Sequence, residues 1–151
     1  MERRRLGRTG LTTSVLGYGA GAVGGLMVRG SAADQERAIA RAVELGINYI
    51  DTAPSYGAGE SERTLGRVLG KLKPDIVLGT KVRLPPGLGR ADLGAAIAAS
   101  MDESLRRLGR DHVDLFQLHN SITAAGGGAT LAADVVLDDV RQAFERLRQQ
   151  G

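Results

Sequence analysis

The sequence predicts an α/β fold in which parallel strands alternate with helices in about four βα units, after a short N-terminal β-hairpin. Two observations predict it. Short apolar runs of the kind that form buried strands alternate with longer segments whose apolar residues recur every three or four positions. Strands that alternate with helices in this way favour a parallel sheet with right-handed crossovers. The 151 residues, 42% of them hydrophobic, suffice for one globular domain.

The chain opens on a turn and a strand. The run 11–19, LTTSVLGYG, is predicted to be a strand, and the sequence GRTG at 7–10 is typical of a turn before it. Residues 3–6 can pair with part of this strand. We therefore expect a small antiparallel hairpin before the βα repeat begins.

The first predicted helix spans 31–45. Ser31 is followed by Asp34 three residues later, which resembles a capping box, and Gly46 ends the helix. The run 47–52, INYIDT, is predicted to be the next strand. Strand, helix and strand in this order make one crossover of a parallel sheet.

The same alternation continues to the end of the sequence. Each later helix carries its apolar residues on one face, and each strand is a short apolar run. The predicted elements are a helix at 61–72, a strand at 76–82, a helix at 91–108, a strand at 113–119 and a helix at 137–150.

Two architectures fit four βα units. One is a small doubly wound sheet, and the other is the N-terminal half of a TIM (β/α)8 barrel, which needs about 250 residues when complete. No linker divides the sequence, so we expect one partial domain over residues 1–151 that ends after the fourth βα unit. A half barrel has two open sheet edges and an uncovered apolar face, which favour self-association.

Ionisable residues end three of the predicted strands. Asp51, Lys81 and His119 each close a largely apolar run, and Tyr56 lies in the loop after Asp51. In a barrel, the C-terminal ends of the strands form the rim that carries catalytic groups. Lys81 is notable because the chain has three Lys and 17 Arg, and Lys has the more tunable pKa.

Each of these residues also has a purely structural interpretation. Asp51 can cap a turn, Tyr56 can be an ordinary loop aromatic, and Lys81 can extend its charge from a strand end into water. His119 can be a hydrogen-bonded core histidine. The catalytic interpretation is favoured because all four structural interpretations would otherwise have to hold at one rim.

A glycine-rich segment at 17–22, GYGAGA, fits the G-x-G-x-x-A dinucleotide pattern. That pattern has to open a helix directly and be followed about 20 residues later by an acidic residue after a second strand. Residues 23–26 begin a helix poorly, so we interpret the segment as the loop after the first strand. The Gly126–Gly128 run is likewise interpreted as a mobile loop rather than a phosphate site.

Several segments together resemble the aldo-keto reductase family. They are RLGRTGL at 5–11, LGYG at 16–19, GINYIDTAPSYG at 46–57, GTKV at 79–82, VDLFQLH at 113–119 and VRQAFERL at 140–147. The resemblance covers nearly the whole chain but only about half of a family member. It implies a (β/α)8 barrel that reduces aldehydes and ketones to alcohols, or runs the reverse reaction, with a nicotinamide cofactor, usually NADPH and otherwise NADH.

The resemblance also implies the site. The family's Asp-Tyr-Lys-His tetrad corresponds in type and order to Asp51, Tyr56, Lys81 and His119. A Tyr with an ordinary pKa near 10 is a weak proton donor at neutral pH, and a neighbouring cation lowers that pKa. Lys81 can supply the cation, Asp51 can hold Lys81 in place, and His119 can orient the substrate carbonyl. The implied cofactor-binding residues are Gly19, Ala20, Gly21 and Asp51.

The composition excludes several other classes of protein and of site. The absence of Cys excludes disulfides and a Cys nucleophile, and two His cannot build a His-rich site, so we expect no metal. No apolar run approaches the ~20 residues of a membrane span, and the charged N-terminus is no secretory signal, which indicates a soluble cytoplasmic protein. The net charge of +3 is dispersed and only five residues are aromatic, so we expect no nucleic-acid partner.

Two functions follow. In the first, the chain is part of a reductase of small carbonyl or sugar-like substrates that turns over once a second half is restored. In the second, it is a non-catalytic half barrel, either a degenerate remnant or an interaction module. For the 151-residue chain alone we expect weak NADPH binding or none, and no carbonyl reduction.

Overall fold

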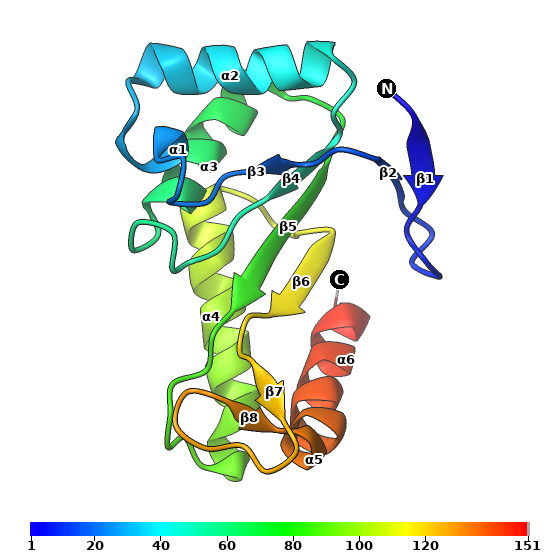
Figure 1. Ribbon diagram of the computed structural model, residues 1–151, viewed down its shortest axis with the longest axis vertical. Helices are drawn as coiled ribbons and strands as arrows, with labels where there is room; N and C mark the ends of the chain where they lie inside the picture. Colours follow the sequence, from blue (N-terminus) through cyan, green and yellow to red (C-terminus); the bar gives the residue numbers. More distant parts are fainter. Residues whose placement is uncertain (151) are drawn as a thin grey trace. The chain divides into compact units, whose positions relative to one another are not determined.

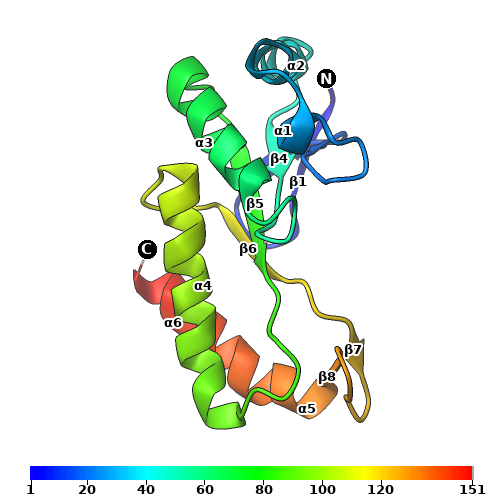
Figure 2. The same cartoon turned by 90° about the vertical axis from the view of Figure 1, so that its left-hand side faces the viewer.

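The computed structural model describes residues 1–150. Figure 1 labels its elements, and Figure 2 shows the same ribbon turned by 90°. Its principal sheet has four strands in the order β3-β4-β5-β6, which is also their order along the chain. A doubly wound sheet reverses its strand order at a switch point, whereas consecutive strands of a barrel are neighbours. The observed order therefore confirms the barrel-type βα repeat, and the sheet of the described residues is not closed.

The chain divides into two compact units. The first consists of residues 1–80 and 104–115, and the second of residues 81–103 and 116–150. Strand β5 (Val77–Val82) starts in the first unit and ends in the second. Each unit has its own cluster of buried apolar side chains.

The N-terminal hairpin is confirmed. Strand β1 (Arg3–Arg5) pairs antiparallel with β2 (Thr12–Ser14), with Arg4 opposite Thr13. Most of the hairpin is exposed, so backbone pairing and the turn chemistry, rather than burial, define it.

The predicted strand at 11–19 is interrupted, which corrects that prediction. The chain bends after Ser14 and resumes as β3 (Tyr18–Gly19). Gly17 lies in the bend against the ring of Tyr49, and a Cβ at this position would lie 2.8 Å from Tyr49 Cδ1. The interruption therefore comes from a close tertiary approach that strand patterning does not reveal.

Two helices follow β3 in the first unit. The four-residue α1 (Leu26–Arg29) was not predicted, whereas α2 (Ala32–Glu44) matches the predicted helix. The Ser31 hydroxyl oxygen accepts a hydrogen bond from the Asp34 backbone N–H at 3.1 Å, as the capping pattern predicts. Gly46 adopts a φ of 88° just beyond the helix, a conformation that glycine favours.

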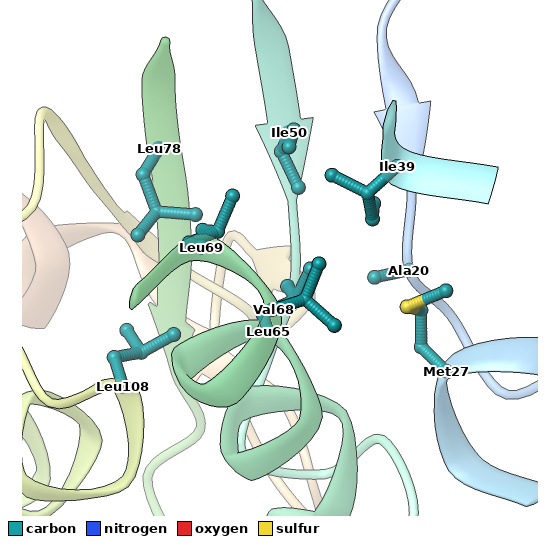
Figure 3. Close-up of a cluster of buried hydrophobic side chains, with 9 residues drawn as sticks. All are labelled: Ala20, Met27, Ile39, Ile50, Leu65, Val68, Leu69, Leu78 and Leu108. Atoms are coloured by element: carbon teal, nitrogen blue, oxygen red, sulfur yellow. The ribbon is translucent and has the colours of Figure 1, made fainter. Parts of the chain in front are cut away.

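The first unit also contains β4 (Tyr49–Asp51), α3 (Glu60–Leu72) and most of β5. β3 pairs with β4 and β4 with β5, both in parallel. Figure 3 shows the core between these strands and the helices, to which α3 contributes one face. The buried residues are Ala20, Met27, Ile39, Ile50, Leu65, Val68, Leu69, Leu78 and Leu108.

The second unit is built around the end of β5 and the strand β6 (Leu115–Leu118), most of which belongs to it. Helix α4 (Leu93–Leu108), which a short turn η1 (Arg90–Asp92) precedes, contributes Leu93 and Ile97 to the core of this unit. A small parallel pair of strands, absent from our expectations, follows β6: β7 (Ile122–Thr123) and β8 (Leu131–Ala132).

The last predicted helix begins earlier than residue 137. It consists of α5 (Ala133–Val135), a π-helical turn η2 (Val136–Val140) and α6 (Arg141–Gln150). Asp134 and Asp139 both contact the Arg90 guanidinium, at 2.9 and 2.6 Å. The wider π turn is compatible with this arrangement, because the two aspartates are five residues apart.

None of the helices in the described part of the chain has both the length and the apolar character needed to cross a bilayer.

Candidate functional site

Asp51 is the last residue of β4, where the sequence places it. The Tyr49 hydroxyl donates a hydrogen bond to Asp51 Oδ1 at 3.2 Å, and the Asp51 carbonyl accepts one from the Ala20 N–H at 2.8 Å. Tyr49 is two residues before Asp51, so both side chains lie on the same side of the strand. Sequence reasoning missed this contact, and the i, i+2 spacing of Tyr49 and Asp51 was the signal that could have revealed it.

Tyr56 lies in the turn that joins β4 to α3. Its N–H donates to the Ala53 carbonyl at 3.1 Å, and its carbonyl accepts from the Ser61 N–H at 3.2 Å. The following residues Gly57, Ala58 and Gly59 have φ values of 63°, 51° and 85°. This left-handed run reverses the chain sharply, so the position of Tyr56 is fixed by local backbone geometry.

The segment Gly19–Gly21 lies beside both of these residues in the first unit. Gly19 pairs with Asp51 in the sheet, and a Cβ on Gly21 would lie 3.9 Å from two ring atoms of Tyr56. A Cβ on Gly19 would meet nothing within 4 Å, so the backbone there is open to close approach. The structure thus brings the sequence-predicted cofactor segment together with Asp51 and Tyr56.

Two buried hydroxyl groups hold this segment in place. Ser61 Oγ donates to the Ala20 carbonyl at 2.8 Å and lies 2.9 Å from Thr52 Oγ1. Both hydroxyl residues are fully buried. They join the end of β4 to the start of α3 and to the loop after β3, so they support the site without facing solvent.

Lys81 and His119 belong to the second unit. Lys81 is the penultimate residue of β5 and is 9% exposed, and His119 follows β6 directly. The His119 N–H donates to the Val82 carbonyl at 2.8 Å, so the two residues lie on neighbouring strands. Asp51 and Tyr56 are in the first unit, and the convergence of all four side chains stays a prediction.

Asn120 fixes the chain immediately after His119. Its side-chain Oδ1 accepts from the Leu84 N–H at 2.8 Å, and its Nδ2 donates to the Leu84 carbonyl at 2.9 Å. The amide thereby continues the strand pairing beyond the strands themselves. Asn120 also borders a cavity of about 240 Å³ between the segment 84–88 and the glycine-rich loop 125–132.

A buried charge that sequence reasoning missed lies in the first unit. Glu62 is fully buried on α3, and its carboxylate accepts hydrogen bonds from Thr80 Oγ1 at 2.7 Å and Arg107 Nε at 2.6 Å. Thr80 is the neighbour of Lys81 in the sequence. The sequence signal that could have revealed the burial of Glu62 was its place three positions before Leu65, on the apolar face of the helix.

Burial raises the pKa of Tyr18, the residue that begins β3. Within residues 1–150, no cluster of three or more Asp, Glu, His or Cys side chains is placed to hold a metal ion.

The sequence of the chain is similar to those of known proteins. The model of the aldo/keto reductase family matches residues 15–151. L-galactose dehydrogenase of Arabidopsis thaliana is 33% identical over 156 residues, which cover the whole chain and 46% of that protein. Aldo-keto reductase YhdN of Bacillus subtilis is 37% identical over 128 residues, covering 79% of the chain and 38% of that protein.

Solved structures agree with these sequence matches. The holo form of aldo-keto reductase AKR11C1 from Bacillus halodurans has a TM-score of 0.72 and 34% identity, and the match covers the whole chain and 47% of that protein. An aldo-keto reductase from Klebsiella pneumoniae in complex with NADPH has a TM-score of 0.68 and 26% identity over 94% of the chain and 44% of that protein. The chain spans about half the length of the relatives that it matches.

Proposed function

Because the chain belongs to the aldo/keto reductase family, we propose that it carries the proton-transfer residues of a nicotinamide-dependent reductase of aldehydes and ketones. One observation carries this proposal. Asp51, Lys81 and His119 lie at or directly after the C-terminal ends of three consecutive strands, and Tyr56 lies in the turn after the first. In barrels this end of the strands carries the catalytic groups.

The chemistry assigned to each residue follows from its type. Reduction of a carbonyl leaves an oxygen that needs a proton, and we assign its delivery to the Tyr56 hydroxyl. We assign to Lys81 the cation that makes this hydroxyl a stronger acid, and to Asp51 the counter-charge that holds the ammonium. His119 would donate a hydrogen bond to the substrate oxygen and fix the angle of the carbonyl.

The segment Gly19–Gly21 and Asp51 would hold the nicotinamide end of the cofactor, which supplies the hydride when bound. The open backbone at Gly19, and the Tyr56 ring that would lie 3.9 Å from a Cβ at Gly21, fit a flat ring at close range. NADPH is the proposed cofactor, supported by the NADPH complex of the Klebsiella pneumoniae relative. NADH is the alternative, because a relative in Escherichia coli is an NADH-specific methylglyoxal reductase.

The proposed substrates are small carbonyl or sugar-like molecules. Relatives named D-threo-aldose 1-dehydrogenase and 6-dehydroglucose reductase support this class. The assignment of residues 1–151 to one partial reductase domain belongs to the same proposal, as does the absence of a nucleic-acid partner. Self-association through the open strand edges stays a prediction, which sedimentation of the 151-residue chain tests.

The experiment joins this chain to the second half of Bacillus halodurans AKR11C1 in one polypeptide and follows NADPH oxidation with glyceraldehyde. We expect Tyr56→Phe to lower kcat by about a hundredfold or more, since general acid catalysis of this kind is worth 10²–10⁴-fold. NADPH binding, followed by its fluorescence, should persist because the ring is retained. Tyr18→Phe is the matched control and should keep most of the rate. If Tyr56→Phe turned over at a rate close to that of the parent, the Tyr56 hydroxyl would not be the proton donor.

A second candidate function is supported by one relative. A rice protein named "Probable voltage-gated potassium channel subunit beta" is 34% identical over 126 residues, which indicates that this family also contains interaction modules. In that case the chain would bind a partner without turnover. Retention of NADPH binding by the joined polypeptide, with no oxidation of NADPH by any aldehyde in a panel, would favour this second function.

A further inference from the structure

Asp51 has a glycine directly beside it on each of the two neighbouring strands. Strand β4 lies between β3 and β5 in the sheet (Figure 1). The register pairs Asp51 with Gly19 of β3 and with Gly79 of β5. Residues that are directly opposite are the ones whose side chains meet most closely across a sheet. Because glycine has no side chain, a side chain of the sheet that supports the Asp51 carboxylate has to come from another position.

Tyr49 contributes such a side chain. It lies two positions before Asp51 on the same face of β4. Its hydroxyl donates a hydrogen bond to Asp51 Oδ1 at 3.2 Å, and both side chains are half-buried. A hydrogen bond donated to a carboxylate stabilises the anion and fixes its orientation. The separation is slightly longer than usual for a hydroxyl donor, so the bond depends on how firmly the ring of Tyr49 is held.

Gly17 leaves the space that the ring of Tyr49 occupies. A Cβ on Gly17 would lie 2.8 Å from Cδ1 of Tyr49 and 3.5 Å from Cε1. The backbone of Gly17 does not have a positive φ, so its conformation alone would also accept an alanine. The glycine is therefore needed here for the ring. On the other side of β4, the residue opposite Tyr49 is the buried Val77 of β5.

We propose that Tyr49 is a positioning residue for Asp51, and that its hydroxyl, aimed by the packing of the ring against Gly17, holds the carboxylate in the orientation that receives the Lys81 ammonium. The inference rests on the proposed function, in which Asp51 is the counter-charge of Lys81. Tyr49 acts through Asp51 and contacts neither substrate nor cofactor. Because the carboxylate itself remains when the hydroxyl is removed, the loss should appear in kcat and not in the binding of NADPH.

The first test observes the Asp51 carboxyl group in the 151-residue chain by NMR, with ¹³C at the side-chain carboxyl carbons of Asp. The Asp51 signal is identified by its loss in Asp51→Asn. Tyr49→Phe keeps the ring, so folding should survive, and the Asp51 signal should move because the carboxylate loses a donor. Tyr18→Phe is the matched control. It removes a hydroxyl from β3 at a side chain that packs against the core cluster of the first unit, and should leave the Asp51 signal unmoved.

The second test measures NADPH oxidation by this chain joined to the second half of Bacillus halodurans AKR11C1. Tyr49→Phe should lower kcat about tenfold, as expected for one hydrogen bond to a charged group, and leave KM for glyceraldehyde and the affinity for NADPH largely unchanged. Gly17→Ala should cause the same kind of loss, because the added Cβ displaces the ring. The two losses should not add in the double variant, since both substitutions remove the same bond.

Three results would overturn the proposal. They are an Asp51 signal that does not move in Tyr49→Phe, a kcat of Tyr49→Phe equal to that of Tyr18→Phe in an active joined polypeptide, and additive losses in the double variant. A parent joined polypeptide that oxidises no NADPH would instead contradict the proposed function. In that case the Asp51 signal alone decides whether Tyr49 holds the carboxylate.

Discussion

Glu62 shows at the scale of one residue how this fold holds a buried charge. Its carboxylate is fully buried and is bonded by the Thr80 hydroxyl and the Arg107 guanidinium. Glu62→Gln keeps the shape but removes the charge opposite Arg107, so the free energy of unfolding should fall by about 1–3 kcal/mol. Urea denaturation measures this change.

The matched control is Glu60→Gln in the same helix. Glu60 pairs with Arg63 at 3.1 Å, but the Glu60 side chain is 46% exposed, and exposed pairs contribute about 0–1 kcal/mol. If the two substitutions lowered the free energy of unfolding equally, burial of Glu62 would not determine its contribution to that free energy.

The raised pKa of Tyr18 predicts that the free energy of unfolding depends on pH. Burial raises the pKa of its hydroxyl above 10.0, so the folded state holds this proton more tightly than the unfolded state. Its contribution to the free energy of unfolding is complete below pH 10 and is lost as the pH rises through the folded-state pKa. Tyr18→Phe should therefore lose less stability than the parent between pH 9 and pH 11 in urea titrations. A parallel decline of both proteins would contradict the assignment.

At the scale of elements, α3 carries two glycines that differ in their surroundings. A Cβ on Gly66 would lie 2.7 Å from the carbonyl oxygens of both Arg107 and Leu108, whereas a Cβ on Gly70 would meet nothing within 4 Å. Gly70→Ala should raise the free energy of unfolding by up to about 1 kcal/mol through helix propensity. Gly66→Ala should lower it by about 1–3 kcal/mol, because backbone atoms have to move. Thermal unfolding of both variants checks this, and stabilisation by both would show that the helices separate easily.

Sequence patterning predicted the elements that have a regular apolar period. Helices α2, α3 and α4 and strands β4, β5 and β6 lie within or close to their predicted ranges. The misses depend on tertiary contacts: the bend at Gly17 follows from the Tyr49 ring, and the π turn η2 accompanies the contacts of Arg90. A local pattern contains no information about partners that are 30 or more residues away.

Some residues of the candidate site could likewise be predicted from the sequence, and others could not. Asp51, Tyr56, Lys81 and His119 could be chosen from the sequence, because strand ends and residue types are both visible there. The side chains that support these four residues could not be predicted from the sequence, because their roles depend on burial. They include Thr52, Ser61, Glu62 and Asn120, which are buried and bonded to neighbouring elements.

At the scale of the whole molecule, the relatives are about twice as long as this chain. It accounts for 46% of the Arabidopsis thaliana dehydrogenase and 47% of AKR11C1. In barrels the phosphate site commonly lies after strands seven and eight, and the four-stranded sheet here corresponds to the first four. The proposed division therefore gives proton transfer to this chain and most of the cofactor binding to the half of the relatives that this chain does not match.

The most direct measurement of this division compares NADPH oxidation by the 151-residue chain alone with that by the chain joined to the second half of AKR11C1. Both are assayed with glyceraldehyde at equal molar concentration. We predict turnover by the joined polypeptide and none by the chain alone. Turnover by the chain alone at a comparable rate would contradict it, because half a barrel would then be a sufficient enzyme.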